Sequence, residues 1–72
     1  MSAQSDFYQA RAAEARASAT EATLDNVRDR WLRSEASWGE MAARSERGDK
    51  RRAQLIEEKA TAADASHAAL LT

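Results

Sequence analysis

The sequence predicts an all-α protein, namely a small antiparallel three-helix bundle formed by one domain of residues 1–72. A quarter of the residues are alanine, and the chain has no proline and only two glycines. This composition favours helix because alanine has the highest intrinsic helix propensity and proline the lowest. Apolar residues recur at intervals of three and four in three successive segments, which places them on one face of a helix. Short stretches of turn-forming residues separate the three segments.

The first helix is predicted over about residues 5–22. Ser5 is the expected N-cap, and Asp6 then lies in the first turn, where a negative charge interacts favourably with the helix dipole. The apolar stripe of this helix begins with Tyr8 and continues entirely in alanine, at residues 12, 15, 19 and 22. This helix therefore offers one aromatic anchor and a surface that another helix can approach closely.

The second helix is predicted over about residues 26–47, after a turn at residues 23–25 in which Asp25 is the expected N-cap. Both tryptophans of the chain lie on its apolar stripe, two turns apart. The members of the stripe follow one another at intervals of four, three, four and three: Val27, Trp31, Ser34, Trp38 and Met41. The regular spacing favours a role for both tryptophans in the core over a role in aromatic recognition.

The third helix is predicted over about residues 49–70. Gly48 and Asp49 have the form of a helix C-cap followed by the N-cap of the next helix. The apolar stripe after them again alternates intervals of three and four, through Ala53, Ile56, Ala60, Ala63, His67 and Leu70.

Two registers support the bundle. Folding the chain back at residues 23–25 places the stripe of the first helix along the stripe of the second, and folding it back at Gly48 places the third stripe there too. Large side chains then meet small ones, which fills space well. The core anchors expected from these registers are Tyr8, Val27, Trp31, Trp38, Met41, Ile56 and Leu70.

The alternative is a helical hairpin in which the second and third helices are continuous and two copies associate into a bundle. A turn at Gly48 would put three positive charges, residues 50–52, in a first helical turn, where they are unfavourable. A straight helix would instead pair Glu46 with Lys50, and an interior glycine costs only about 1 kcal/mol. In that case one side of Trp31 and Trp38 is bare and marks a partner or dimer surface.

The predicted core is thin, because its middle layer consists of Ala15, Ser34 and Ala63. A domain of 72 residues with so little apolar burial is only marginally stable alone. We therefore expect association with another protein or with a second copy, as a homo-oligomer. The apolar side chains outside the predicted seams form the candidate partner surface: Phe7, Leu32, Leu55 and Leu71.

The sequence indicates a protein that is not an enzyme and binds no cofactor or metal. The chain has no cysteine, and its single histidine, His67, has no second ligand at a metal-binding spacing. Residues 1–6 lack the basic-then-apolar pattern of a secretory signal, and no apolar run approaches the ~20 residues that span a bilayer. We expect no membrane insertion and a cytoplasmic location.

A local basic cluster gives the alternative function, a nucleic-acid-associated regulator. Net charge is −1, so the chain lacks the overall basic excess typical of nucleic-acid binders, and no aromatic residue is interleaved in the cluster. A solvated face is the favoured interpretation, and nucleic acid is an unlikely partner on this evidence. The possible phosphate contacts are Arg44, Arg47, Lys50, Arg51 and Arg52.

Part of the sequence resembles uncharacterised short alanine- and arginine-rich helical-hairpin proteins of GC-rich bacteria. In these an aromatic-led, alanine-rich helix precedes a helix of the form R-x-x-L-x-x-A-x-x-W/Y, and Trp31 stands where histidine is frequent. The resemblance covers Phe7 to about Arg47; it implies a helical hairpin, and the proteins concerned have no established activity. It rests on residues 7–14, 22–23, 26–34, 38 and 41–42.

The expected function is that of a small non-catalytic helical module for protein–protein interaction, or of an accessory or structural protein. Its partner is not specified by the sequence.

Overall fold

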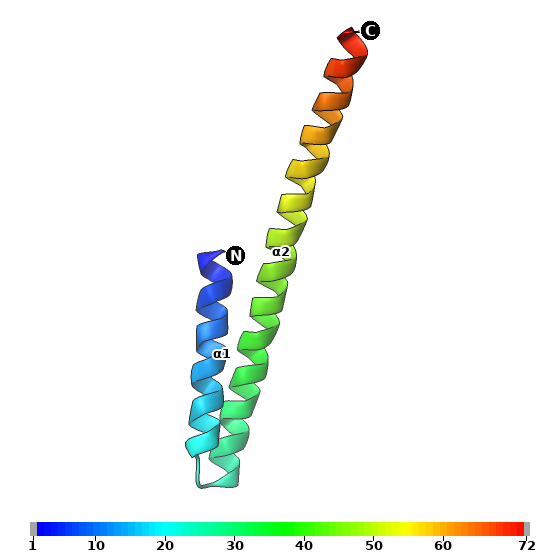
Figure 1. The fold of residues 1–72 in the computed structure, drawn as a ribbon. Helices are drawn as coiled ribbons and strands as arrows, with labels where there is room; N and C mark the ends of the chain where they lie inside the picture. The colour runs from blue at the N-terminus through cyan, green and yellow to red at the C-terminus, as the bar shows by residue number, and fades with distance from the viewer. Residues whose placement is uncertain (1, 72) are drawn as a thin grey trace.

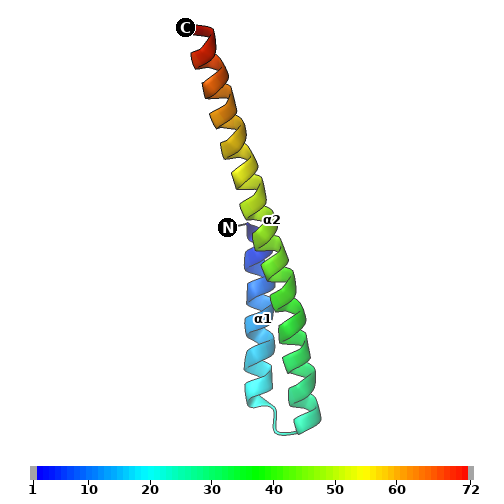
Figure 2. The ribbon, with the colours of Figure 1, turned by 90° about the vertical axis from the view of Figure 1, so that its right-hand side faces the viewer.

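The computed structural model describes residues 2–71, and these form two α-helices. Helix α1 runs over Ala3–Glu21 and helix α2 over Asp25–Leu71. The two helices are antiparallel and lie side by side along the whole of α1, whereas the second half of α2 extends beyond it alone (Figure 1, Figure 2). The molecule is a rod with extents of 72 × 14 × 12 Å. The all-α prediction is confirmed, and the three-helix bundle is wrong.

The N-cap of helix α1 lies three residues before the predicted one. Ser2 is the N-cap, and its Oγ accepts a hydrogen bond of 3.2 Å from the backbone N–H of Ser5. The first backbone bond of the helix runs from the N–H of Asp6 to the carbonyl of Ser2, at 3.1 Å. Ser5 was therefore assigned the wrong role: it lies inside the helix and is fully buried against α2.

The predicted turn between the first two helices is confirmed to within one residue. Helix α1 ends as the backbone of Ala22 becomes extended, and α2 begins at Asp25. The side chain of Arg28 closes the turn, because its guanidinium donates 2.9 Å to the carbonyl of Ala22 and 3.2 Å to the carboxylate of Asp25.

The predicted register of this hairpin is also confirmed. Tyr8 and Met41 line one cavity between the helices, and Ala15 and Ser34 line another. The only apolar residues that are buried among those described are alanines, at positions 15, 19 and 42. Because these side chains are so small, the two helices approach closely but bury little apolar surface.

Helix α2 passes through Gly48 without a break, so the third helix and its register against the second are wrong. No described glycine has a positive φ, as a helix-ending glycine often would. Ile56 is 70 % exposed and Leu70 is 85 % exposed, so neither is a core anchor in the single chain. A continuous helix costs about 1 kcal/mol at Gly48, whereas a turn would place the charges of residues 50–52 at the positive end of a helix dipole. The continuous helix that the sequence left as an alternative is the one observed.

Candidate interaction surfaces

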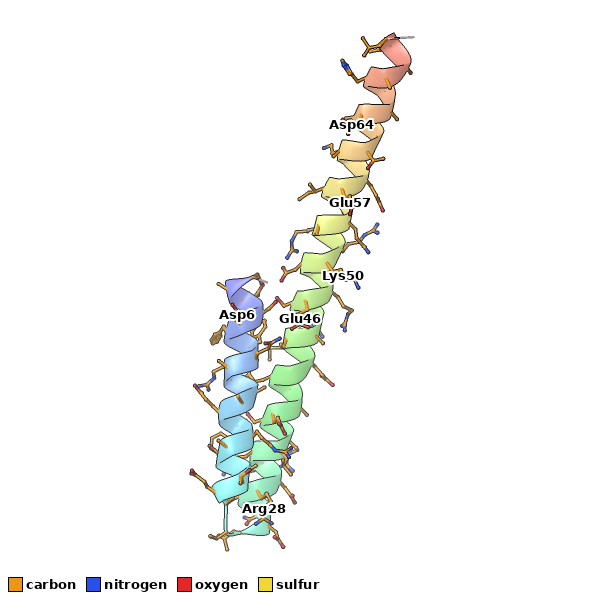
Figure 3. The ribbon with its side chains drawn as sticks, viewed as in Figure 1. Asp6, Arg28, Glu46, Lys50, Glu57 and Asp64 are labelled. Carbon is orange, nitrogen blue, oxygen red and sulfur yellow. The ribbon has the colours of Figure 1, made fainter. Side chains whose placement is uncertain are left out.

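The part of α2 that extends beyond α1, residues 50–71, is here named the arm. All of its residues are exposed. Figure 3 shows the side chains of Glu57 and Asp64 on the arm with no part of α1 beside them. The arm therefore presents every face of a long helix to its surroundings.

The apolar stripe of the arm continues the stripe of α2 that packs on α1. At 3.6 residues per turn, Ile56 and Leu70 lie within about 20° of Val27 around the helix axis, and Ala63 lies about ten turns directly beyond it. Val27 is half-buried under α1, whereas Ile56 and Leu70 are exposed. One face of one helix is thus covered by α1 in its first half and uncovered in its second.

A shallow hollow of about 340 Å³ lies on the arm near its junction with the hairpin. Leu55 and Ile56 form its apolar floor, and Arg52 and Lys59 flank them one turn to either side. An apolar floor with basic edges suits a helix that buries apolar side chains and brings negative charge or helix carbonyls beside them.

The junction between hairpin and arm is a polar cluster around the N-terminus of α1. The Ser5 hydroxyl lies 2.9 Å from Ser45 Oγ and 3.0 Å from Asp49 Oδ2, and Arg52 pairs with the same carboxylate. Hydrogen bonds from Ser2 and Ser5, and then from Arg52, lower the pKa of Asp49, while partial desolvation opposes them. A carboxylate from α2 thus lies at the positive end of the α1 dipole, where negative charge is stabilising.

This cluster joins the two helices and was missed by the sequence interpretation. Gly48 and Asp49 were interpreted together as a turn, so Asp49 was assigned to cap a helix that does not exist. The signal was present in the hairpin register, which extends by one turn from Tyr8 and Met41 to Ser5 and Ser45.

An aromatic cluster lies one turn from the junction. The ring of Trp38 is 5.9 Å from that of Phe7 and 6.0 Å from that of Tyr8, and the guanidinium carbon of Arg11 lies 5.3 Å from the Trp38 ring centroid. These distances are typical of favourable aromatic and cation–π contacts. Trp38 is accordingly the main anchor of the hairpin.

The other predicted anchors differ in burial. Tyr8, Val27 and Met41 are half-buried between the helices, whereas Trp31 remains 41 % exposed. Trp31 is left partly bare because no third helix covers it. The side chains predicted to meet a partner are all exposed: Phe7, Leu32, Leu55 and Leu71.

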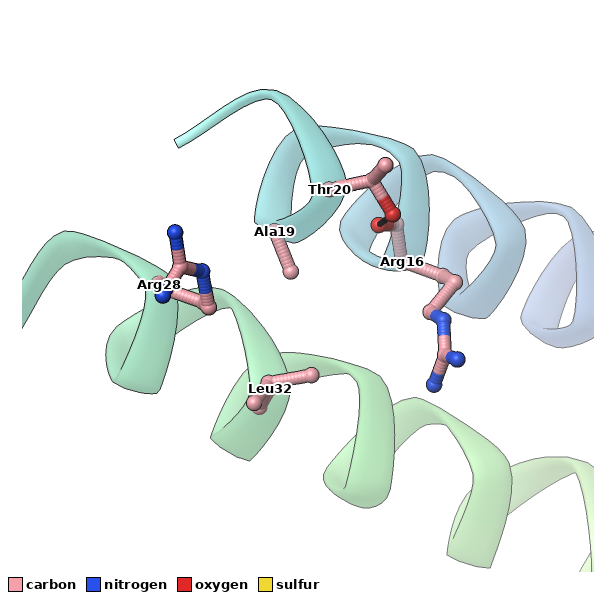
Figure 4. Close-up of a pocket in the computed structure, with 5 residues that line it drawn as sticks. All are labelled: Arg16, Ala19, Thr20, Arg28 and Leu32. Carbon is pink, nitrogen blue, oxygen red and sulfur yellow. Dashed lines mark hydrogen bonds between the residues drawn. The ribbon is translucent and has the colours of Figure 1, made fainter. Parts of the chain in front are cut away.

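A second hollow, of about 280 Å³, lies between the helices near the turn (Figure 4). Ala19 and Leu32 form its apolar wall, and Arg16 and Arg28 stand at its edges. Both guanidiniums are already paired, Arg16 with Glu35 at 3.5 Å and Arg28 at the turn. The hollow is therefore not a ready anion site.

Four of the five residues of the basic cluster lie on one face of α2. All five side chains, at residues 44, 47, 50, 51 and 52, are exposed. At about 100° per residue, Arg44, Arg47, Lys50 and Arg51 lie within about 120° of one another, whereas Arg52 lies outside this arc and is paired with Asp49. Glu40 lies on the same face one turn before Arg44, so the face carries mixed charge.

His67 lies on the arm and is exposed. Residues 2–71 contain no group of three or more His, Cys, Asp or Glu side chains that could hold a metal ion. Across the same residues, no helix is long and apolar enough to cross a membrane.

No known protein family, curated protein or solved structure matches this chain. The resemblance to helical-hairpin proteins accordingly remains an expectation. The hairpin, the arm and the junction between them are the grounds on which a function is proposed.

Proposed function

We propose that this protein is a non-catalytic helical interaction module, in which the hairpin is the anchored base and the arm is the docking element. The observation that carries the proposal is the continuity of the α2 stripe: the face that binds α1 extends along the arm, where nothing in residues 2–71 covers it. A helix from another protein, or from a second copy, would occupy this face as a continuation of α1.

The energetics favour such an occupant. Most of the stability of a helix in a protein comes from tertiary packing, and the fully exposed arm has none. Ile56, Leu70 and Leu71 are all largely exposed, and burial of each such side chain contributes about 1.5–3 kcal/mol. A partner helix would thus stabilise the arm while it gains affinity from the same contacts. The lack of cysteine suits a reducing compartment such as the cytoplasm, where we place this interaction.

Site-specific photocrosslinking in living cells tests the proposal. A photoreactive amino acid at Ala63 lies on the stripe, whereas the same residue at Ala65 lies on the opposite face of the arm. We expect a discrete protein adduct from position 63 and none, or much less, from position 65. Equal adducts from the two positions, or none from either, would contradict the arm as docking element.

The alternative, a nucleic-acid role, would rest on Arg44, Arg47, Lys50 and Arg51, which share one face of α2 with the acidic Glu40. It predicts salt-sensitive binding of duplex DNA or RNA that Arg47→Ala with Arg51→Ala would weaken. Absence of binding at low salt would remove it.

A further inference from the structure

We infer that the occupant of the arm is the arm of a second copy of this chain, packed antiparallel, so that two hairpins stand at opposite ends of one long rod. This inference rests on the proposed docking role of the arm and adds the identity, direction and register of the partner.

Continuity with the α1–α2 interface supports the arrangement. Helix α1 runs antiparallel to α2. The N-terminus of α1 lies beside Asp49, the residue before the arm. An antiparallel partner arm would run in the same direction as α1 and continue its line along the same α2 face. The partner would also offer what α1 offers to α2, a stripe rich in alanine with a few larger side chains.

The arm is complementary to itself in this direction. A two-fold axis between residues 61 and 62 places Ala60 against the partner's Ala63 and Ile56 against the partner's His67. Small residues then meet at the centre of the pair. Each large aliphatic side chain faces a residue of another type on the partner. A parallel pair would instead stack Ile56 on the partner's Ile56 and Ala63 on the partner's Ala63, which packs unevenly.

The distribution of charge along the arm also favours antiparallel over parallel packing. The last turn of α2, at the negative end of the helix dipole, has no basic side chain. Arg52 lies within about 20° of the stripe, and antiparallel packing brings it to the last turn of the partner, where positive charge is favourable. Parallel packing would instead bring Arg52 against the partner's Arg52.

The lengths fit. In this register Leu71 of the partner lies opposite Arg52, and Ser2 lies opposite Gly48 when the hairpin register is extended. The end of the partner arm therefore comes about 6 Å beyond the start of α1, at 1.5 Å per residue. The two segments share the α2 face without overlap.

Sedimentation equilibrium over a range of concentrations tests the dimer, with two matched variants of the full chain. Ala63→Asp puts a charge on the stripe, and Ala65→Asp makes the same change on the opposite face, with the same effect on helix propensity. We expect the wild type and Ala65→Asp to dimerise with dissociation constants within about threefold, and Ala63→Asp to weaken the dimer more than tenfold. A monomeric wild type, or equal weakening by both variants, overturns the inference.

Distances between spin labels test the direction. The chain has no cysteine, so single cysteines at Ala62 and at Ser37 can each be labelled cleanly. We expect the two labels in the dimer to lie within about 20 Å at residue 62 and about 74 Å apart at residue 37, at 1.5 Å per residue. Short distances at both positions indicate a parallel dimer and overturn the register.

Different results would overturn the docking role of the arm and its self-association. If the purified wild type is monomeric while Ala63 crosslinks to another protein in cells, the self-association is overturned and the docking role stands. If position 63 gives no adduct and the protein is monomeric, both are overturned.

Discussion

At the residue scale, Trp38 and Asp49 are the two residues of α2 that each contact several side chains at the N-terminal half of α1. Trp38 contacts both aromatic residues of α1 and the guanidinium of Arg11. Asp49 accepts hydrogen bonds at the start of α1 and pairs with Arg52. One residue supplies apolar contact and the other fixes the end of α1, so the hairpin depends on both despite its thin core.

Replacement of Trp38 is expected to be more damaging than replacement of Trp31. Trp38→Ala removes half-buried contacts with two rings, so we expect a loss of about 2–4 kcal/mol in the free energy of unfolding. Trp31→Ala removes a side chain that is already 41 % exposed, and about 1–2 kcal/mol is expected. Urea unfolding followed by circular dichroism measures both. Equal losses would indicate that a further element covers Trp31.

Loss of the Asp49 charge is expected to destabilise the hairpin in a pH-dependent way. The folded state lowers the pKa of Asp49 below its unfolded value, so its contribution is present above about pH 4 and is lost as pH falls through the folded pKa. Asp49→Asn should be less stable than the wild type at neutral pH, and the gap should narrow below about pH 4.

Thermal unfolding at several pH values measures this gap, with Asp64→Asn on the exposed arm as the control. A gap that is independent of pH, or one that the control reproduces, would show that the Asp49 charge does not stabilise the hairpin.

At the element scale, the sequence predicted the hairpin and failed at Gly48, for a physical reason. The stripe of the arm is in phase with the stripe of α2 on a straight helix, so the same spacing is compatible with folding back and with continuing. The choice then depended on local signals. The cations of residues 50–52 indicated the continuous helix correctly. The Gly48–Asp49 pair indicated a turn wrongly, because Asp49 lies within α2 and accepts a hydrogen bond from the Ser5 hydroxyl of α1.

The candidate surface was predictable only in part. The exposure of Leu55 and Leu71 followed from their position off the stripe, whereas that of Ile56 and Leu70 depended on the path of the chain at Gly48. Trp31 was correctly expected to be bare if the helix continued.

Substitution of Gly48 by alanine is expected to stabilise α2 by about 0.5–1 kcal/mol. The new Cβ would lie 3.4 Å from the side chain of Arg52, which is flexible and can move. Gly39→Ala is the matched control, since its Cβ would meet nothing within 4 Å, and we expect a similar gain. Thermal unfolding by circular dichroism measures both. Destabilisation by Gly48→Ala alone would indicate that the chain turns there.

At the scale of the whole molecule, the long shape is the feature that the proposed function uses. The radius of gyration of the Cα atoms is 20.5 Å. A compact domain of this length would have about 11 Å. The difference reflects the arm, which α1 does not cover and which leaves a helix face free for a partner.

The central claim is that α2 is continuous and holds the arm away from the hairpin. The distance between labels at Arg33 and Ala65, both exposed, tests it most directly, with excess unlabelled protein added so that only distances within one chain are measured. A continuous α2 predicts about 48 Å between the two backbone positions, at 1.5 Å per residue. A separation of about 10 Å, as between neighbouring packed helices, would contradict it.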